Sequence, residues 1–378
     1  MMQDLDAQQI KDIANGAAFL GSGGGGTLSS ALDMVEKSFS PGKPVELMTV
    51  AEAADDTQGF TAAASYMGSQ TRGKDVTNVD AVQFAIKRLS AIMQERTGKP
   101  IKRLVPVELG VQSSVVPCLL AAQQMGLGVV DGDGAGRAVM GAMITTYAAA
   151  GLDPNPGVAA NSAGSCAIME PSPNDVDEGF HDPALIFNEM VDGLTLAHAF
   201  GVAGVCVWPM DGEQLQRGVP ITGTLDLAEQ VGQALRTQAA PVDTVLKILT
   251  DQGLWARVIF RGKVDTVTST ARDYSTVTVA GDSGIKATVM TAGESVIAWQ
   301  SDRDQPIGMG PDSLCWMTPD GQAFSNTQIP ATGTDVVLIG IGARQPLLES
   351  AEIMKYFHYF QKKVGYTGDY VPIQKLQG

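Results

Sequence analysis

The sequence predicts an α/β protein, with an N-terminal three-layer part built on a largely parallel sheet and a β-rich C-terminal domain. Up to about residue 150, apolar strand-like segments alternate with amphipathic helical segments, which is typical of crossover connections in a parallel sheet. From Trp255 onward, short β-rich segments are separated by Gly, Asp and Ser, as in antiparallel sheets. A stretch rich in Pro, Gly, Asn and Asp over 154–182 is the expected loop or boundary between the parts. We therefore expect two domains, over residues 1–170 and 171–378.

Local signals place the helices and strands of the first half. Asp6 and Gln9 have the spacing of a capping box, so the first helix should start at Asp6 and run to the glycines after Leu20. An amphipathic helix with Thr77 or Asn78 near its cap should end at Lys99-Pro100. Further helices are expected from Thr27, over 115–125 and over 140–150, and strands over 45–50, 60–66, 101–107 and 128–130.

The second half begins with helical segments and then becomes β-rich. Residues 183–200 and 225–235 fit helices, with an apolar strand over 202–208 between them. A helix is expected after Arg344. The predicted strands of the β-rich part cover 258–260, 264–270, 276–279, 287–290, 296–299, 314–317 and 336–341.

The charge balance limits the classes of partner. The chain has 26 Lys and Arg against 41 Asp and Glu, a formal net charge of −15. Such a surface repels phosphate backbones and anionic lipid, so we expect no nucleic-acid partner and no membrane partner. The start of the chain lacks a signal-peptide pattern, no apolar run reaches ~18 residues, and four scattered cysteines are typical of reduced thiols. We expect a cytoplasmic protein that binds a small-molecule substrate, and base rates for such enzymes are compatible with a homodimer.

A glycine run lies between the first two predicted helices. Gly23, Gly24, Gly25 and Gly26 allow backbone N–H groups to approach a ligand, and the N-terminus of the following helix favours an anion. Because the run follows a helix, it is neither a Walker loop nor a dinucleotide fingerprint, both of which need a preceding strand. It is either a flexible connection or a cradle for a carboxylate or a polar ring.

Three carboxylates and an arginine follow two predicted strands. Asp131 and Asp133 come directly after 128–130, and the carboxyl ends of parallel strands are where α/β proteins bind ligands. They could form an acid/base pair, bind a metal or hold substrate N–H groups, while Arg137 could pair with a substrate carboxylate. Glu108 ends 101–107 and should face the same edge. The alternatives are a turn in which the aspartates accept backbone amides, and a salt-bridged strand end for Glu108.

The segment from Asn161 to Cys166 contains a Gly-Ser turn and a thiol. Cys166 is a candidate nucleophile and Asn161 a candidate substrate ligand, although no histidine is close in sequence and most cysteines are buried apolar residues. The chain has three histidines and lacks His-x-His, His-Glu-x-x-His and Cys-x-x-Cys. We therefore expect no cofactor, with a divalent metal held by Asp131, Asp133 and a distant histidine as the alternative.

Six segments together resemble the family named for S-methyl thiohydantoin desulfurase. Each segment alone is weakly specific, but their order and spacing are similar to those of the family over almost the whole chain. The segments are Leu20–Gly25, Pro106–Gly110, Val130–Ala138, Gly223–Leu225, Gly262–Val264 and Gly365–Ile373.

The chain departs from the family pattern in three places. After Gly-Arg-Ala the family usually has an aromatic residue, Pro and Glu, where this chain has Val139-Met140-Gly141. Val111 stands where a second glycine is common, and Gln374 stands where Glu often follows. Because these positions surround the proposed pocket, the substrate could differ from that of other members.

The resemblance implies the same α/β and β-rich parts, and a hydrolase that attacks C2 of an S-methylated hydantoin-like ring, releases methanethiol and leaves a hydantoin. We expect Asp131 or Asp133 to position the ring or activate water, with Glu108 assisting. Arg137 or the glycine amides would hold a substrate carboxylate, and a covalent version makes Cys166 the nucleophile. A metal-dependent ring hydrolase, a non-catalytic binding protein and a subunit of a hydantoinase-type system stay open as alternatives.

Overall fold

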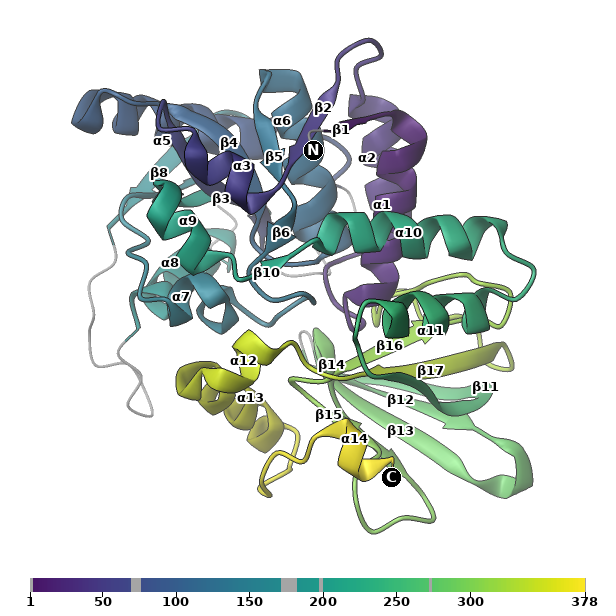
Figure 1. The fold of residues 1–378 in the computed structure, drawn as a ribbon. Coiled ribbons are helices and arrows are strands. Elements are labelled where there is room, and N and C mark those ends of the chain that lie inside the picture. Colours follow the sequence, from purple (N-terminus) through teal and green to yellow (C-terminus); the bar gives the residue numbers. More distant parts are fainter. Residues whose placement is uncertain (1–2, 69–75, 171–181, 197–199, 272–273, 378) are drawn as a thin grey trace.

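The computed structural model describes residues 3–68, 76–170, 182–196, 200–271 and 274–377, which form two sheets with helices around them (Figure 1). The first sheet has eight strands and the second has seven. The predicted α/β part followed by a β-rich part is confirmed. Within the described residues, no helix is both long enough and apolar enough to cross a bilayer.

The first sheet is mixed, with a parallel centre and antiparallel flanks. Its strands are β1 (Gln3–Leu5), β2 (Val45–Met48), β3 (Phe60–Met67), β4 (Ile101–Pro106), β5 (Gly128–Val130), β7 (Gly157–Ala160), β8 (Cys166–Met169) and β9 (Ala203–Met210). Their order is β1-β2-β5-β4-β3-β9-β7-β8, and β2, β5, β4 and β3 are parallel to one another. The other pairings are antiparallel, and β9 joins this sheet from beyond residue 170.

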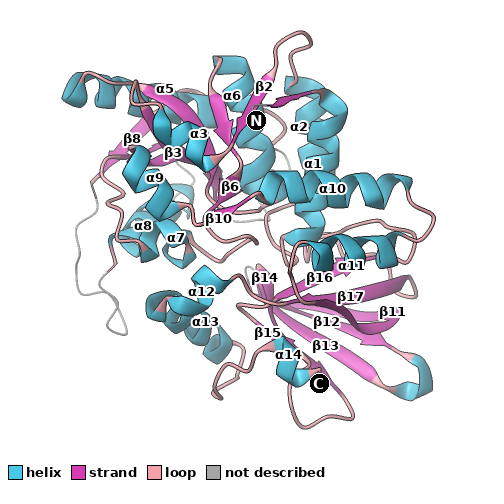
Figure 2. Ribbon diagram, viewed as in Figure 1, coloured by secondary structure: helices cyan, strands magenta, loops and turns pink. Residues whose placement is uncertain are grey.

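Helices cover both faces of the first sheet (Figure 2). Ala62 and Ala64 of β3 belong to one apolar core and Ala63 to the other, as expected for a strand buried on both faces. The first core contains residues from α1 (Ala7–Leu20), α2 (Leu28–Ser38), α5 (Asp80–Thr97), α6 (Val116–Met125), α10 (Thr224–Thr237) and α11 (Pro241–Asp251). The second contains residues from α3 (Val50–Asp55), α7 (Thr146–Ala149), α8 (Pro183–Leu196), α9 (Gly212–Gly218), α12 (Gln345–Glu349) and α13 (Ala351–Lys363).

The second sheet is antiparallel and shares a core with the first part. Its order is β15-β14-β13-β12-β11-β17-β16. Cys315, Val337 and Ile339 pack into the same core as α1, whereas Trp316 and Leu338 belong to a separate core on the other face. The strands are β11 (Ala256–Ala271), β12 (Tyr274–Ala280), β13 (Lys286–Ala292), β14 (Glu294–Gln300), β15 (Gly308–Met309), β16 (Ser313–Met317) and β17 (Asp335–Ile341). Smaller elements are the ribbon of β6 (Gly132–Asp133) with β10 (Ile221–Thr222), and α14 (Ile373–Leu376).

Some local predictions were wrong. The expected helix over 140–150 is interrupted because Thr145 is extended (φ −120°, ψ 155°) and caps α7 through its own hydroxyl, leaving a 3₁₀ turn over Ala142–Ile144. The expected loop over 154–182 contains the hairpin of β7 and β8, and its residues 171–181 lie outside the described ranges. Helix α5 begins after Val79, and Asn78 lies next to this cap as expected, with its Oδ1 accepting from Asp80 N–H (3.2 Å).

Candidate active site

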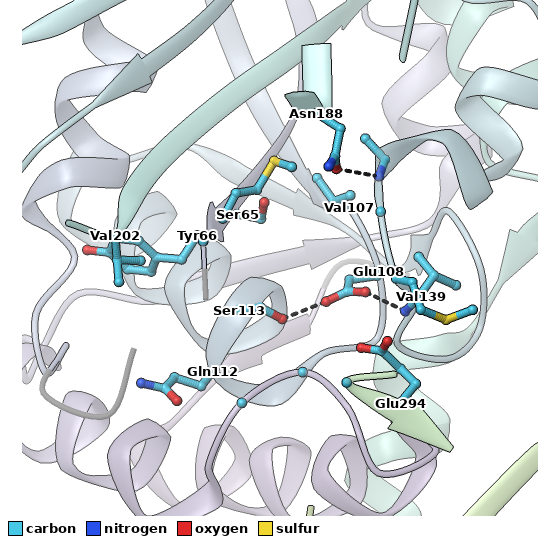
Figure 3. A pocket seen from close by; sticks show the side chains of 18 of the residues that line it. Ser65, Tyr66, Val107, Glu108, Gln112, Ser113, Val139, Asn188, Val202 and Glu294 are labelled. Carbon is cyan, nitrogen blue, oxygen red and sulfur yellow. Dashed lines mark hydrogen bonds between the residues drawn. The ribbon is translucent and has the colours of Figure 1, made fainter. Parts of the chain in front are cut away.

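A cavity of about 220 Å³ lies where the first sheet meets the second (Figure 3). Its wall includes the residues at the C-terminal ends of the parallel strands β3 and β4, among them Ser65 and Glu108. The glycine loop, the segment over 139–142 and helix α8 contribute further parts of the wall. Glu294, the first residue of β14, also lines the cavity. The position agrees with the rule that ligands of α/β proteins bind beyond the carboxyl ends of the strands.

Glu108 is a buried carboxyl on this wall with a raised pKa. The residue is 8% exposed, and burial raises its pKa to about 7. The Ser113 hydroxyl donates to its Oε1 (2.6 Å) and the Val139 N–H donates to its Oε2 (2.6 Å), and both bonds oppose the rise in pKa. Because each oxygen is held by one donor, the carboxyl has a fixed orientation and is poised to exchange a proton near neutral pH.

A tight turn after β4 brings Ser113 to Glu108, and Gly110 leaves the space between their side chains free. The chain enters a π-helical turn over Val111–Val115 and then α6. A Cβ at Gly110 would lie 2.4 Å from Glu108 Oε1 and 2.1 Å from Ser113 Oγ. Only glycine therefore leaves room for the hydrogen bond between these two side chains.

The glycine loop forms one side of the cavity and also joins the two parts of the fold. Gly25 and Gly26 line the cavity, and their positive φ angles of 78° and 86° suit glycine. A Cβ at Gly24 would lie 2.2 Å from Glu294 Oε1, and one at Gly23 would lie 2.4 Å from Asn326 Nδ2. The four predicted glycines are thus divided between the cavity wall and close approaches to Glu294 of the second sheet and to Asn326 in the loop between β16 and β17.

Glu294 was not found by sequence reasoning. It is 4% exposed, it lies at the start of β14, and Figure 3 shows its carboxyl on the same side of the cavity as Glu108. No motif surrounds it in the sequence, and only the packing of the second sheet against the glycine loop brings it to the cavity. Of the cavity residues that the structure describes, Glu108, Asp192 and Glu294 carry carboxyl groups and none is Lys, Arg or His.

Asp131 and Asp133 lie apart from this cavity. Asp131 Oδ1 accepts from Leu225 N–H (2.8 Å) at the start of α10, and burial raises its pKa to about 6. Asp133 is fully buried, and its Oδ1 accepts from the N–H groups of Ala135 and Gly136, both at 2.7 Å. Burial raises the pKa of Asp133 as well. Both aspartates therefore accept hydrogen bonds from backbone N–H groups, and neither lines the cavity with Glu108.

Arg137 is a buried connection between the two parts of the fold. It is 1% exposed, and its Nη1 donates to the carbonyl oxygens of Pro311 (2.9 Å) and Asp312 (2.8 Å). Its Nε donates to the carbonyl of Ala138 (3.0 Å), and its guanidinium lies 5.4 Å from the ring centre of Phe357. These contacts hold the guanidinium on backbone oxygens, and Arg137 does not line the cavity, although its charge acts on the wall carboxyls of Glu294 and Glu108.

Asn161 and Cys166 lie in the β7–β8 hairpin, also away from the cavity. Asn161 Oδ1 accepts from the N–H groups of Ala163 and Ser165, both at 3.0 Å, and so shapes the turn. Cys166 is exposed, and partial burial raises the pKa of its thiol. Within the described ranges, no group of three or more His, Cys, Asp or Glu side chains is arranged to hold a metal ion.

Comparison with known proteins identifies the family. The family model for the N-terminal domain of S-Me-THD-like proteins matches residues 8–171, and that for the C-terminal domain matches residues 191–373. The chain belongs to the S-Me-THD-like family. A crystal structure of a protein from Chromobacterium violaceum is similar over 98% of this chain and 100% of that chain, with 26% identity and a TM-score of 0.87. No curated protein matches the sequence.

The segment over 139–141, where the sequence is expected to depart from the family pattern, forms part of the cavity wall. Val139, Met140 and Gly141 all line the cavity, and the N–H of Val139 binds Glu108. Val111 is buried in the apolar core of the first part. A sequence difference at 139–141 therefore changes the surface that a ligand would meet.

Proposed function

We propose that this member of the S-Me-THD-like family is a hydrolase that cleaves the C–S bond at C2 of an S-methylated, hydantoin-like ring bound in the 220 Å³ cavity. The observation that carries the proposal is Glu108, a buried carboxyl with a pKa of about 7 on the cavity wall. Family membership supports the ring chemistry, and Glu108 supports a reaction that needs proton transfer at neutral pH.

In the proposed reaction, Glu108 acts first as a base and then as an acid. C2 lies between two ring nitrogens and is electrophilic. The Glu108 carboxylate takes a proton from water as the water oxygen bonds to C2. The attack places the electron pair of the C2=N bond on the ring nitrogen. The C2–S bond then breaks, and the sulfur receives the proton from Glu108 and leaves as methanethiol. The proton of the new C2 hydroxyl moves to the ring nitrogen as C2 becomes a carbonyl carbon. One water is consumed, and Glu108 returns to its starting charge.

Other parts of the wall would bind the ring while charge develops. Attack at C2 builds negative charge on a ring nitrogen, which hydrogen-bond donors stabilise. The backbone N–H groups of Gly25 and Gly26 are our candidates, because these residues place backbone on the wall without side chains. The Glu294 carboxyl is the candidate acceptor for a ring N–H. The roles expected for Asp131, Asp133 and Arg137 in substrate contact are not part of this proposal, because none of them lines the cavity.

Methanethiol release from purified protein tests the proposal directly. The substrates are two S-methylated thiohydantoins, one with a neutral C5 substituent and one with a propionate arm, each assayed with and without EDTA. We expect release that follows enzyme concentration, survives EDTA and rises tenfold per pH unit up to about pH 7, as Glu108 loses its proton. Absence of release with both rings would reject the desulfurase assignment, and loss with EDTA that a divalent ion restores would favour the metal-dependent hydrolase.

A further inference from the structure

Ser65 differs from the other hydroxyl-bearing residues on the cavity wall. The residue is 2% exposed, and its Oγ has no hydrogen-bond partner among the described residues. Buried polar atoms without a partner are costly and therefore rare in proteins. Figure 3 shows the Ser65 hydroxyl among the side chains that line the cavity. The residue lines the cavity but its Oγ is covered, so a ligand can supply the missing partner once a small rotation of the side chain uncovers the oxygen.

The other hydroxyl groups of the described wall already donate their protons to protein oxygens. Tyr66 donates to the carbonyl of Asn78 (2.8 Å), and Thr195 donates to the carbonyl of Asp192 (3.0 Å). The remaining hydroxyl, on Ser113, donates to Glu108 Oε1 (2.6 Å). Of the hydroxyl groups on the described wall, the one on Ser65 is thus left without a protein acceptor for its proton.

The sheet register places Ser65 close to the catalytic candidate. Ala64 of β3 pairs with Pro106 of the parallel strand β4, so Ser65 lies one residue beyond this pair and Glu108 two residues beyond it. Neighbouring strands are about 4.8 Å apart. A flat five-membered ring can reach both strand ends at once, with a different polar edge toward each.

We infer that the Ser65 hydroxyl donates a hydrogen bond to the C4 carbonyl oxygen of the ring and thereby turns C2 toward Glu108. This assignment rests on the proposed function for the identity of the ring. C2 and C4 flank the same ring nitrogen, so a bond at the C4 oxygen fixes the direction of C2. When they are ionised, the carboxylates of Glu108 and Glu294 can only accept hydrogen bonds. They therefore cannot donate a hydrogen bond to a carbonyl oxygen of the ring.

Two rings that differ at C4 test the assignment by equilibrium binding. Hydantoin has carbonyl groups at C2 and C4, whereas 2-imidazolidinone has only the C2 carbonyl. We expect Ser65→Ala to raise the Kd of hydantoin roughly 3- to 10-fold in an NMR titration and to leave the Kd of 2-imidazolidinone unchanged. Unchanged hydantoin affinity, equal weakening of both rings, or no saturable binding of hydantoin to the wild-type protein would each overturn the assignment.

The stability of the variants separates ligand binding from a structural role. Ser65→Ala removes a hydroxyl without a protein partner, so we expect its Tm to equal or slightly exceed that of the wild type. The matched control on the same strand is Thr61→Val, because Thr61 is 1% exposed and its hydroxyl accepts from Arg103 Nε (3.1 Å). We expect this control to lower Tm and to leave both Kd values unchanged. A Tm loss in Ser65→Ala as large as in the control would overturn the ligand role.

The same titration distinguishes this inference from the proposed reaction. If the wild-type protein releases no methanethiol but Ser65→Ala still weakens hydantoin alone, the desulfurase assignment fails and the Ser65 assignment stands. If methanethiol is released but the Ser65→Ala variant binds both rings as the wild type does, the reaction stands and the role of Ser65 is wrong.

Discussion

The ends of the neighbouring parallel strands β4 and β5 carry carboxyl groups that resemble one another in sequence and differ in use. Glu108 follows β4, and Asp131 and Asp133 follow β5, with burial raising the pKa of all three. Glu108 lines the cavity, whereas Asp131 caps α10 and Asp133 accepts the amides of its own turn. A raised pKa therefore does not by itself mark a reactive group, and access to a cavity is the feature that separates these carboxyls.

The largest expected effect is on turnover. We expect Glu108→Gln to lower kcat/KM by about 10²–10⁴-fold, because it removes the proton acceptor while keeping the size of the side chain. The matched control is Asp131→Asn, which retains an oxygen to accept from Leu225 N–H. It should stay within a few-fold of wild type in the methanethiol assay. Equal losses in the two variants would mean that the β5 carboxylates act in the reaction, as the sequence alone suggested.

The second effect concerns Arg137, which the sequence had indicated as a ligand for a substrate carboxylate. Arg137→Met would leave the carbonyl groups of Pro311 and Asp312 without their donor, so we expect the free energy of unfolding to fall by about 3 kcal/mol. Urea denaturation measures this loss. The exposed Arg261 provides a control, and Arg261→Met should change stability by less than about 0.5 kcal/mol. Unchanged stability with a raised KM for the propionate-armed ring would restore the substrate role of Arg137.

The pH dependence of stability gives a smaller effect with a definite sign. Burial raises the pKa of Glu108 to about 7 and the pKa values of Asp131 and Asp312 to about 6. At pH 5 to 6 the folded protein therefore keeps protons that the unfolded chain has lost. The contribution of these carboxyls to the free energy of unfolding is fully present below their pKa values in the unfolded chain. It is lost as the pH rises through their raised pKa values in the folded protein.

Urea denaturation at intervals from pH 5 to pH 8 measures this loss. We expect the free energy of unfolding to fall by a few kcal/mol between pH 5 and pH 7.5, and the fall to become smaller in Glu108→Gln. The lowered pKa of Asp56 acts in the opposite direction, but only below about pH 4. Stability that rises with pH across this interval would show that these carboxyls are not held protonated by burial.

The sequence predicted those features that depend on local pattern. The capping box of Asp6 and Gln9 and the alternation of strands with helices both appear in the structure. Strand β4, which precedes Glu108, also ends within one residue of the position expected from the sequence. The helix expected over 140–150 failed, because apolar composition cannot show that Thr145 is extended and begins a separate helix.

The candidate site depended on contacts that no local pattern records. Glu294 reaches the cavity only because the second sheet packs against the glycine loop. Ser65 lies in an apolar strand, and its unpartnered hydroxyl is visible only when every neighbouring donor and acceptor is placed. Asp131 and Asp133 had the expected residue type and the expected strand end, but the direction of a side chain beyond a strand depends on the turn that follows.

The smallest expected effect is at Cys166. This thiol lies on β8 in the hairpin with β7 and outside the cavity wall, so we expect Cys166→Ser to change kcat/KM less than twofold. The pKa of the thiol is raised by partial burial, which leaves less thiolate at neutral pH and disfavours a nucleophilic role. The rate of methanethiol release and the search for a protein adduct by intact-mass measurement give independent readouts. A large loss of turnover together with a wild-type adduct that Cys166→Ser abolishes would instead support the covalent mechanism, and would move the reaction from Glu108 to the edge of the sheet.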